Sequence, residues 1–155
     1  MKIFRLFTGI LMLTSVFLGG CSSTGGGSLK VNLFASSNAS LDEMGRPLSV
    51  IVRVYQLSEA RAFATSSFVD LWKNDIKILG REMLSRQEIF IVPNSTRDIQ
   101  IRKDVNARYI AVVALFRNPV SGRWRAYRPV SNGYLKKRFN QGIQITLRNN
   151  ELIMN

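Results

Sequence analysis

The strongest constraint on the fold is a period-two alternation of apolar and polar residues that recurs in short segments along the chain. Residues 29–33 read Leu-Lys-Val-Asn-Leu, and residues 48–57 continue the same pattern. Such alternation is typical of strands whose two faces meet different surroundings. Five further segments alternate or are apolar throughout, and turn sequences separate them: 86–92, 97–102, 107–117, 123–129 and 142–148. Seven short strands predict an all-β fold, a two-sheet β-sandwich, and not an α/β sheet.

One segment departs from this period and predicts a small helical insertion near residues 66–84. Ser67 and Asp70 have the spacing of a capping box, in which two side chains cap each other's backbone N–H groups. Apolar residues follow at helical spacing: Phe68, Leu71 and Trp72, then Ile76, Leu79 and Met83. We expect one or two short helices that pack on an edge or an end of a sheet.

The N-terminal residues 1–20 have the pattern of a lipoprotein signal peptide. Lys2 and Arg5 precede an apolar run, residues 6–18, which would rise roughly 20 Å as a helix and would not cross a hydrocarbon core of roughly 30 Å. The run ends in Leu-Gly-Gly-Cys, which resembles the bacterial lipobox and implies a covalent lipid on Cys21. Because Cys21 is the only cysteine of the chain, we reject an ordinary secretory signal with a chance cysteine.

The mature chain divides into a tether and one domain. Residues 21–28 are mostly serine and glycine, and they predict a flexible tether. Residues 29–155 are then the β-sandwich domain with its helical insertion. Ser22, and not Asp, follows the cysteine, which in enteric-type sorting favours the outer membrane.

Composition excludes most catalytic chemistry. The chain has no histidine, so it can form neither a Ser-His-Asp triad nor a His-ligated metal site. Its 10 acidic residues offer no pair suited to acid–base catalysis, because Asp42 and Glu43 are adjacent and point apart, Asp70 fits a helix cap, and Asp75 fits a first helical turn. We predict no enzyme activity, no metal and no cofactor beyond the lipid; a small carboxylate hydrolase remains a weaker alternative.

Positive charge is concentrated in the last third of the chain. Residues 101–155 hold 11 basic and two acidic residues, which gives them +9 of the total +12. An exported lipoprotein rarely meets nucleic acid, and no recognition motif is present, so we expect no nucleic-acid binding. Contact with anionic lipid or cell-wall glycan stays open, and so does a solvated face without a partner. The candidate basic surface comprises Arg123, Arg125, Arg128, Lys136, Lys137 and Arg138.

A long polar loop, residues 35–47, joins the first two predicted strands. Its 13 residues exceed the usual two to five of a hairpin connection, and long loops in compact domains are often functional. Leu41 and Met44 should be exposed at its tip, where they would offer apolar anchors. A merely long loop is the alternative. The candidate binding residues are Asn38, Ala39, Ser40, Leu41, Asp42, Glu43, Met44 and Arg46.

Several blocks resemble the TssJ (SciN-like) lipoproteins of type VI secretion systems. They are Gly-Arg-Pro at 45–47 with Val-Arg-Val-Tyr-Gln-Leu at 52–57, Phe-Val-Asp-Leu at 68–71, Tyr-Ile-Ala-Val-Val-Ala-Leu-Phe at 109–116, and Trp-Arg at 124–125. The resemblance implies a transthyretin-like β-sandwich at the periplasmic face of the outer membrane. It also implies that the loop between the first two strands binds the periplasmic C-terminal region of the inner-membrane protein TssM, within a complex with TssL. The leading hypothesis is therefore a structural assembly lipoprotein; the alternative is an envelope lipoprotein that binds glycan or anionic lipid through the basic third.

Overall fold

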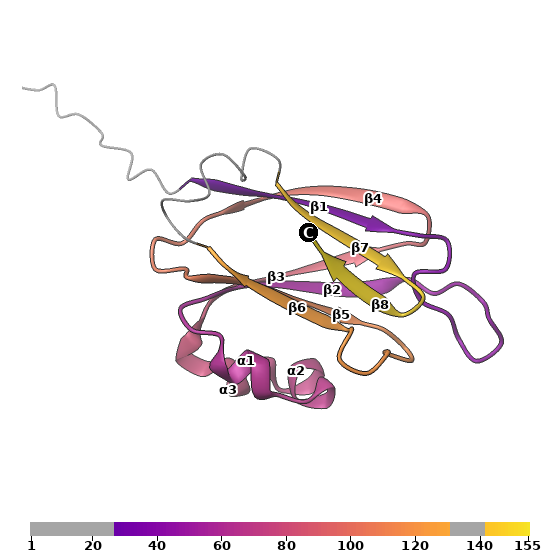
Figure 1. Ribbon diagram of the computed structural model, residues 1–155, viewed down its shortest axis with the longest axis horizontal. Coiled ribbons are helices and arrows are strands. Elements are labelled where there is room, and N and C mark those ends of the chain that lie inside the picture. The colour runs from indigo at the N-terminus through magenta and orange to yellow at the C-terminus, as the bar shows by residue number, and fades with distance from the viewer. Residues whose placement is uncertain (1–26, 131–141) are drawn as a thin grey trace, which may run out of the picture.

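The computed structural model describes residues 27–130 and 142–155, which form two stacked sheets with short helices on one side (Figure 1). Four predictions lie outside these residues: the signal peptide, most of the tether, the lipid attachment at Cys21, and the basic residues Lys136, Lys137 and Arg138.

Eight strands build the two sheets in the described part of the chain, one more than the sequence predicts. The first sheet has the order β4-β1-β7-β8, with bounds Ser95–Arg102, Ser28–Ala35, Ile143–Arg148 and Glu151–Met154. The second has the order β3-β2-β5-β6, with bounds Met83–Ile91, Val50–Leu57, Tyr109–Leu115 and Arg125–Pro129. Among the pairings of these eight described strands, the one between β1 and β7 is parallel and the others are antiparallel. The additional strand is β8.

The alternating apolar residues of the two sheets form the core between them, which confirms the predicted β-sandwich. In β1, Leu29, Val31 and Leu33 are buried whereas Lys30 is exposed. Burial of one such aliphatic side chain stabilises a fold by roughly 1.5–3 kcal/mol. The period-two pattern thus records which face of β1 meets the opposite sheet.

The helical insertion covers the outer face of the second sheet, and the prediction of packing on a sheet edge or end is wrong (Figure 1). Phe63 is fully buried and lies edge-on to the rings of Tyr55 in β2 and Tyr127 in β6, at centroid distances of 6.0 and 5.9 Å. Strand β5 is buried on both faces because the first sheet covers one and the helices cover the other. A strand covered on both sides reads as a continuous apolar run.

The bounds of the insertion differ from the prediction at both ends. Helices α1, α2 and α3 span Arg61–Thr65, Phe68–Lys73 and Asp75–Leu79, and a 3-10 turn follows at Gly80–Glu82. Met83 begins β3 and is not helical. The capping box is confirmed: the Asp70 N–H donates to Ser67 Oγ and the Ser67 N–H to Asp70 Oδ2, both at 3.1 Å. Ile76 is exposed because the helix breaks at Asn74, so its face no longer continues that of Leu71.

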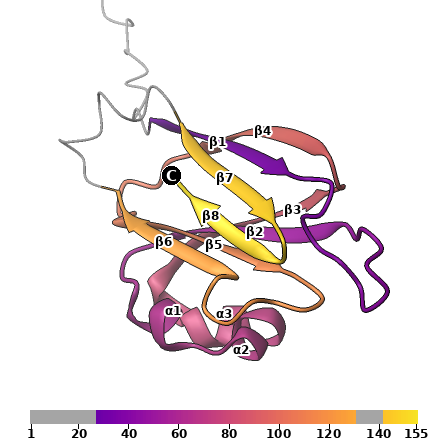
Figure 2. The same ribbon diagram turned by 45° about the vertical axis from the view of Figure 1, so that its right-hand side comes forward.

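The start of the described chain and the loop between β1 and β2 lie at opposite ends of the sandwich (Figures 1 and 2). The carbonyl of Gly27 accepts a hydrogen bond of 2.8 Å from the N–H of Lys103. We call the end with Gly27 and the loop 103–108 the N-terminal pole, and the end with the loop 36–49 the loop pole. None of the helices in 27–130 or 142–155 has the length and apolar character needed to cross a membrane.

Candidate functional site

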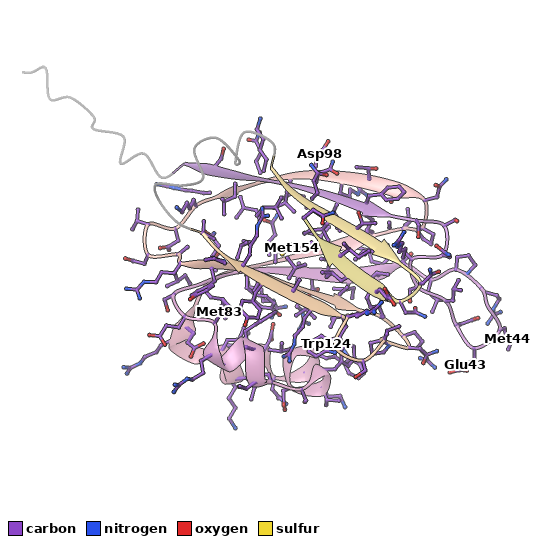
Figure 3. The ribbon with its side chains drawn as sticks, in the orientation of Figure 1. Glu43, Met44, Met83, Asp98, Trp124 and Met154 are labelled. Atoms are coloured by element: carbon purple, nitrogen blue, oxygen red, sulfur yellow. The ribbon has the colours of Figure 1, made fainter. Side chains whose placement is uncertain are left out.

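The loop 36–49 extends beyond the sheets at the loop pole, and Glu43 and Met44 lie at its tip (Figure 3). It closes on itself as a small hairpin. Leu41 and Pro47 form an isolated antiparallel bridge, and the Asp42 N–H donates to the Arg46 carbonyl at 3.0 Å. The loop therefore has a neck at the bridge and a five-residue tip beyond it.

The Asp42 carboxylate holds this tip in shape. Its Oδ1 accepts from the backbone N–H groups of Met44 and Arg46 at 2.9 and 2.8 Å, and its Oδ2 accepts from Arg46 Nε at 2.7 Å. These bonds lower the pKa of Asp42, and the backbone N–H of Arg46 is the largest cause. Gly45 has φ of 74°, a left-handed conformation that disfavours other residues. A tip ordered before binding loses less conformational entropy when a partner arrives.

The base of the loop is fixed to the turn between β7 and β8. Asn149 and Asn150 donate their backbone N–H groups to the carbonyls of Asn38 and Ala39 at 2.9 and 3.0 Å. The Asn150 side chain accepts from the Leu41 N–H at 3.1 Å. Both asparagines have positive φ, of 52° and 59°, as a two-residue type I′ hairpin turn requires. The last hairpin of the chain therefore supports the neck of the loop.

The structure divides the predicted binding residues into exposed and buried ones. Met44 is 78% exposed, as predicted. Leu41 is half-buried at the neck, so the prediction that it lies exposed at the tip is wrong. Ala39 and Ser40 are fully buried at the base and present no side chain to a partner. The accessible part of the predicted site is Asn38, Glu43, Met44 and Arg46, with Asp42 acting through the shape of the tip.

A neighbouring turn, residues 118–122, belongs to the same pole, although its sequence indicates no role beyond that of a turn. The Val120 N–H donates to the Asn150 carbonyl at 3.3 Å, and the Val120 side chain is partly exposed. Arg117, just before this turn, faces Glu43 at 3.8 Å. The β7–β8 turn, which the sequence analysis does not predict, contacts both loops. Predicting that turn would have placed residues 118–122 beside the loop 36–49.

The structure does not bring the three described residues of the candidate basic surface together. Arg123 pairs with Glu151 at 2.9 Å. The Arg125 guanidinium donates to the carbonyls of Phe63, Ala64 and Ser66 at 2.6–2.8 Å, and it lies 4.7 Å from the Trp124 ring centroid. Arg128 pairs with Ile110 of β5 in register, on the opposite face of β6 from Arg125. Arg125 joins the helices to β6 and is therefore not available to a glycan or a lipid.

A charged cluster missed by the sequence analysis fastens the helices to the second sheet. Asp75, which is buried, accepts from the Tyr55 hydroxyl at 2.8 Å and lies 3.3 and 3.2 Å from the guanidinium groups of Arg53 and Arg86. Burial raises the pKa of Tyr55 above its ordinary range, and the Arg53 hydrogen bond lowers the pKa of Glu88. Both carboxylates are engaged by arginines, so the cluster is built for attachment. No group of three metal-ligating side chains occurs in the described residues.

Comparison with protein families decides what kind of protein carries this loop. The profile of the type VI secretion lipoproteins (VasD, EvfM, TssJ) matches residues 27–150, which is nearly all of the domain. The chain belongs to this family. The family comprises structural lipoprotein components of the secretion system and not enzymes, and the match confirms the resemblance seen in the sequence. Among curated proteins, none matches the sequence.

Solved structures confirm the sandwich. The lipoprotein TssJ1 of Pseudomonas aeruginosa superposes with a TM-score of 0.72 at 21% identity, covering 84% of this chain and 96% of its own. Lip of Serratia marcescens, a membrane-bound component of the system, gives 0.73 at 20%, covering 83% and 96%. A chain in the structure of the TssM C-terminal domain from EAEC gives 0.68 at 20%, covering 83% and 97%. At these identities the likeness concerns the fold.

Proposed function

We propose that this type VI secretion lipoprotein is anchored by a lipid on Cys21 at the periplasmic face of the outer membrane. Through the loop 36–49 it binds the periplasmic C-terminal region of TssM and so helps to assemble the trans-envelope complex with TssL. The observation that carries the proposal is the position of the loop. It is a pre-ordered hairpin at the pole opposite the chain end that leads to Cys21.

The geometry suits a partner that approaches from the cell interior. The tether leaves the domain at Gly27, so a lipid on Cys21 holds the N-terminal pole near the membrane. Strand β1 then runs from that pole to Ala35, where the loop begins. An exposed apolar side chain at the centre of a docking surface, here Met44, is the kind of residue that carries much of the binding energy. Charged neighbours such as Glu43 and Arg46 contribute orientation.

The test compares two side chains of similar exposure at opposite poles. Met44 is 78% exposed and Val105 is 74% exposed. Calorimetric titration with the periplasmic region of TssM should show at least about tenfold weaker binding for Met44→Ser, because central anchors contribute about 1.4 kcal/mol or more. Val105→Ser should bind like the unchanged protein. Equal affinity of all three proteins would place the site elsewhere.

A further inference from the structure

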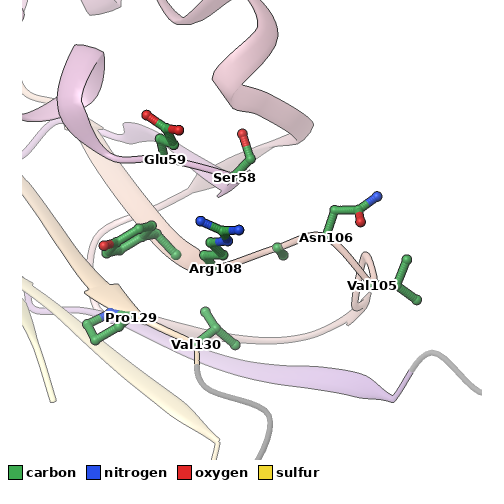
Figure 4. Close-up of a pocket in the computed structure, with 9 residues that line it drawn as sticks. Ser58, Glu59, Val105, Asn106, Arg108, Pro129 and Val130 are labelled. Carbon is green, nitrogen blue, oxygen red and sulfur yellow. The ribbon is translucent and has the colours of Figure 1, made fainter.

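The N-terminal pole carries a second exposed feature, the loop 103–108, which joins β4 to β5. Val105 lies at its outer end and is 74% exposed, and Arg108 lies at its inner end beside a hollow of about 560 Å³ (Figure 4). Arg102 and Arg108 flank the loop, are both exposed, and form no salt bridge with another described residue. The loop thus presents an exposed aliphatic side chain between two exposed arginines.

The loop is rigid at its base, so its exposure is a fixed property of the fold. The buried side chain of Gln56 donates to the Arg102 carbonyl at 2.9 Å and accepts from the Asp104 N–H at 2.8 Å. The Asp104 carboxylate is used within the loop, where it accepts from the Asn106 N–H at 2.8 Å. The Asp104 carboxylate is therefore hydrogen-bonded within the loop, and neither Arg102 nor Arg108 has a described carboxylate within salt-bridge distance.

The tether brings this loop to a membrane. From Cys21 to Gly27 a fully extended chain spans at most roughly 20 Å. Gly27 is hydrogen-bonded directly to Lys103, so the loop 103–108 lies where the tether ends. Confinement this close to the bilayer gives a high effective concentration, and contacts that would be weak between free molecules are then populated.

We propose that the loop 103–108, with Arg102, Arg108 and Val105, rests on the anionic phospholipid surface that holds the acyl anchor. The proposal depends on the lipid on Cys21 in the proposed function and adds the surface that orients the domain. Arg102 and Arg108 face lipid phosphates, and Val105 enters the interface between headgroups and acyl chains. Each basic side chain at such a surface strengthens partitioning roughly fivefold. Docking of this pole keeps the loop pole directed away from the membrane.

The test places a dye on the acylated, full-length mature protein. Since Cys21 is acylated and is the only native cysteine, Val105→Cys supplies the one free thiol for a polarity-sensitive dye, and Ser121→Cys supplies a matched site at the loop pole. The proteins are incorporated into phosphatidylcholine vesicles with or without phosphatidylglycerol. Flotation measures anchoring, and dye emission measures contact.

The expected result is a blue shift at position 105 with phosphatidylglycerol. It should be absent at position 121, weakened by high salt, and lost in the double variant Arg102→Gln/Arg108→Gln, which still floats. Floating protein with no shift at position 105 overturns the inference and leaves anchoring intact. Three other results overturn it as well. They are a blue shift at both positions, an equal blue shift in vesicles that lack phosphatidylglycerol, and a blue shift that occurs only with isolated cell-wall sacculi. Protein that does not float overturns the anchoring and the inference together.

Discussion

The two poles of the domain use the same kinds of residue in opposite ways. At the loop pole, the charged groups of the tip satisfy one another, since Arg46 pairs with Asp42 and Arg117 faces Glu43. The most exposed large hydrophobic side chain there is the flexible Met44. At the N-terminal pole, Arg102 and Arg108 have no acidic partner in the described chain, and Asp104 serves the backbone.

This difference separates two kinds of recognition. A tip with internally paired charges and a protruding methionine is suited to a shaped, apolar pocket on another protein. Unpaired arginines around a small aliphatic residue are suited to a flat anionic surface, where position matters less than charge. The net charge of the chain therefore says little about function until it is known which charged side chains form ion pairs.

The largest effect we expect comes from a change that touches neither pole. Asp75→Ala leaves the Tyr55 hydroxyl without its acceptor and removes a partner from Arg53 and Arg86, so the free energy of unfolding should fall by about 3 kcal/mol. Urea unfolding measures the loss. Glu88→Gln, at a more exposed carboxylate, is the milder control. If the folded Asp75→Ala protein also lost TssM binding, the poles would not be independent of the helical layer.

Removing the tip alone should separate binding from stability. Replacement of residues 43–45 by Asn-Gly shortens the tip to a two-residue turn between Asp42 and Arg46. It keeps the Leu41–Pro47 bridge and the hydrogen bond from the Asp42 N–H to the Arg46 carbonyl. TssM binding should weaken at least about 100-fold, equivalent to about 2.7 kcal/mol, in calorimetric titration. The thermal unfolding midpoint should barely move, because the buried residues Ala39 and Ser40 remain. Unchanged affinity would remove the loop from the binding site.

A change to the Asp42 carboxylate should loosen the tip without shortening it. Asp42→Asn should weaken TssM binding about tenfold, because the tip must then be ordered on binding. The folded pKa of Asp42 lies below its usual value of 3.8, so its contribution is present above about pH 4 and is lost as pH falls through the folded pKa. As pH falls, the Met44 and Arg46 amides should lose their hydrogen bonds to Asp42. Their hydrogen-exchange rates should then exceed those expected from the intrinsic effect of pH on exchange. If the exchange rates of these amides depended on pH in the same way in Asp42→Asn, the Asp42 carboxylate would not be what orders the tip.

The smallest effect should come from the outermost pair. Glu43 and Arg117 lie 3.8 Å apart and are both well exposed, so Glu43→Gln should change the free energy of unfolding by no more than about 0.5 kcal/mol. If Glu43 steers the partner, the association rate should change and lose part of its salt dependence. Stopped-flow association at two salt concentrations measures this. A larger stability loss would show that the tip is more tightly coupled to the domain than its contacts indicate.

The sequence predicts features that depend on local pattern and misses those that depend on distant contacts. Period two identified seven strands, and the Ser67–Asp70 box located the start of α2. The sequence does not predict strand β8, because a segment of four residues is too short to show an alternating pattern. It forms a strand because the turn at Asn149 and Asn150 is held against the loop 36–49. The burial of Ala39 and Ser40 escaped prediction for the same reason, since the neighbouring Asn38 side chain bonds to Asn149, 111 positions away. The cluster around Asp75 likewise joins an insertion to strands on either side of it.

The support of the loop by the last hairpin sets an order of events during synthesis. The residues of the loop are among the first of the domain to be synthesised, yet their base is completed by Asn149 and Asn150, almost at the end of the chain. Strand β1 must wait equally long for its parallel neighbour β7. Contacts so far apart along the chain close late in folding. A half-synthesised chain therefore has no formed loop, and a partner that recognises the shape of the loop would bind only molecules whose synthesis is complete.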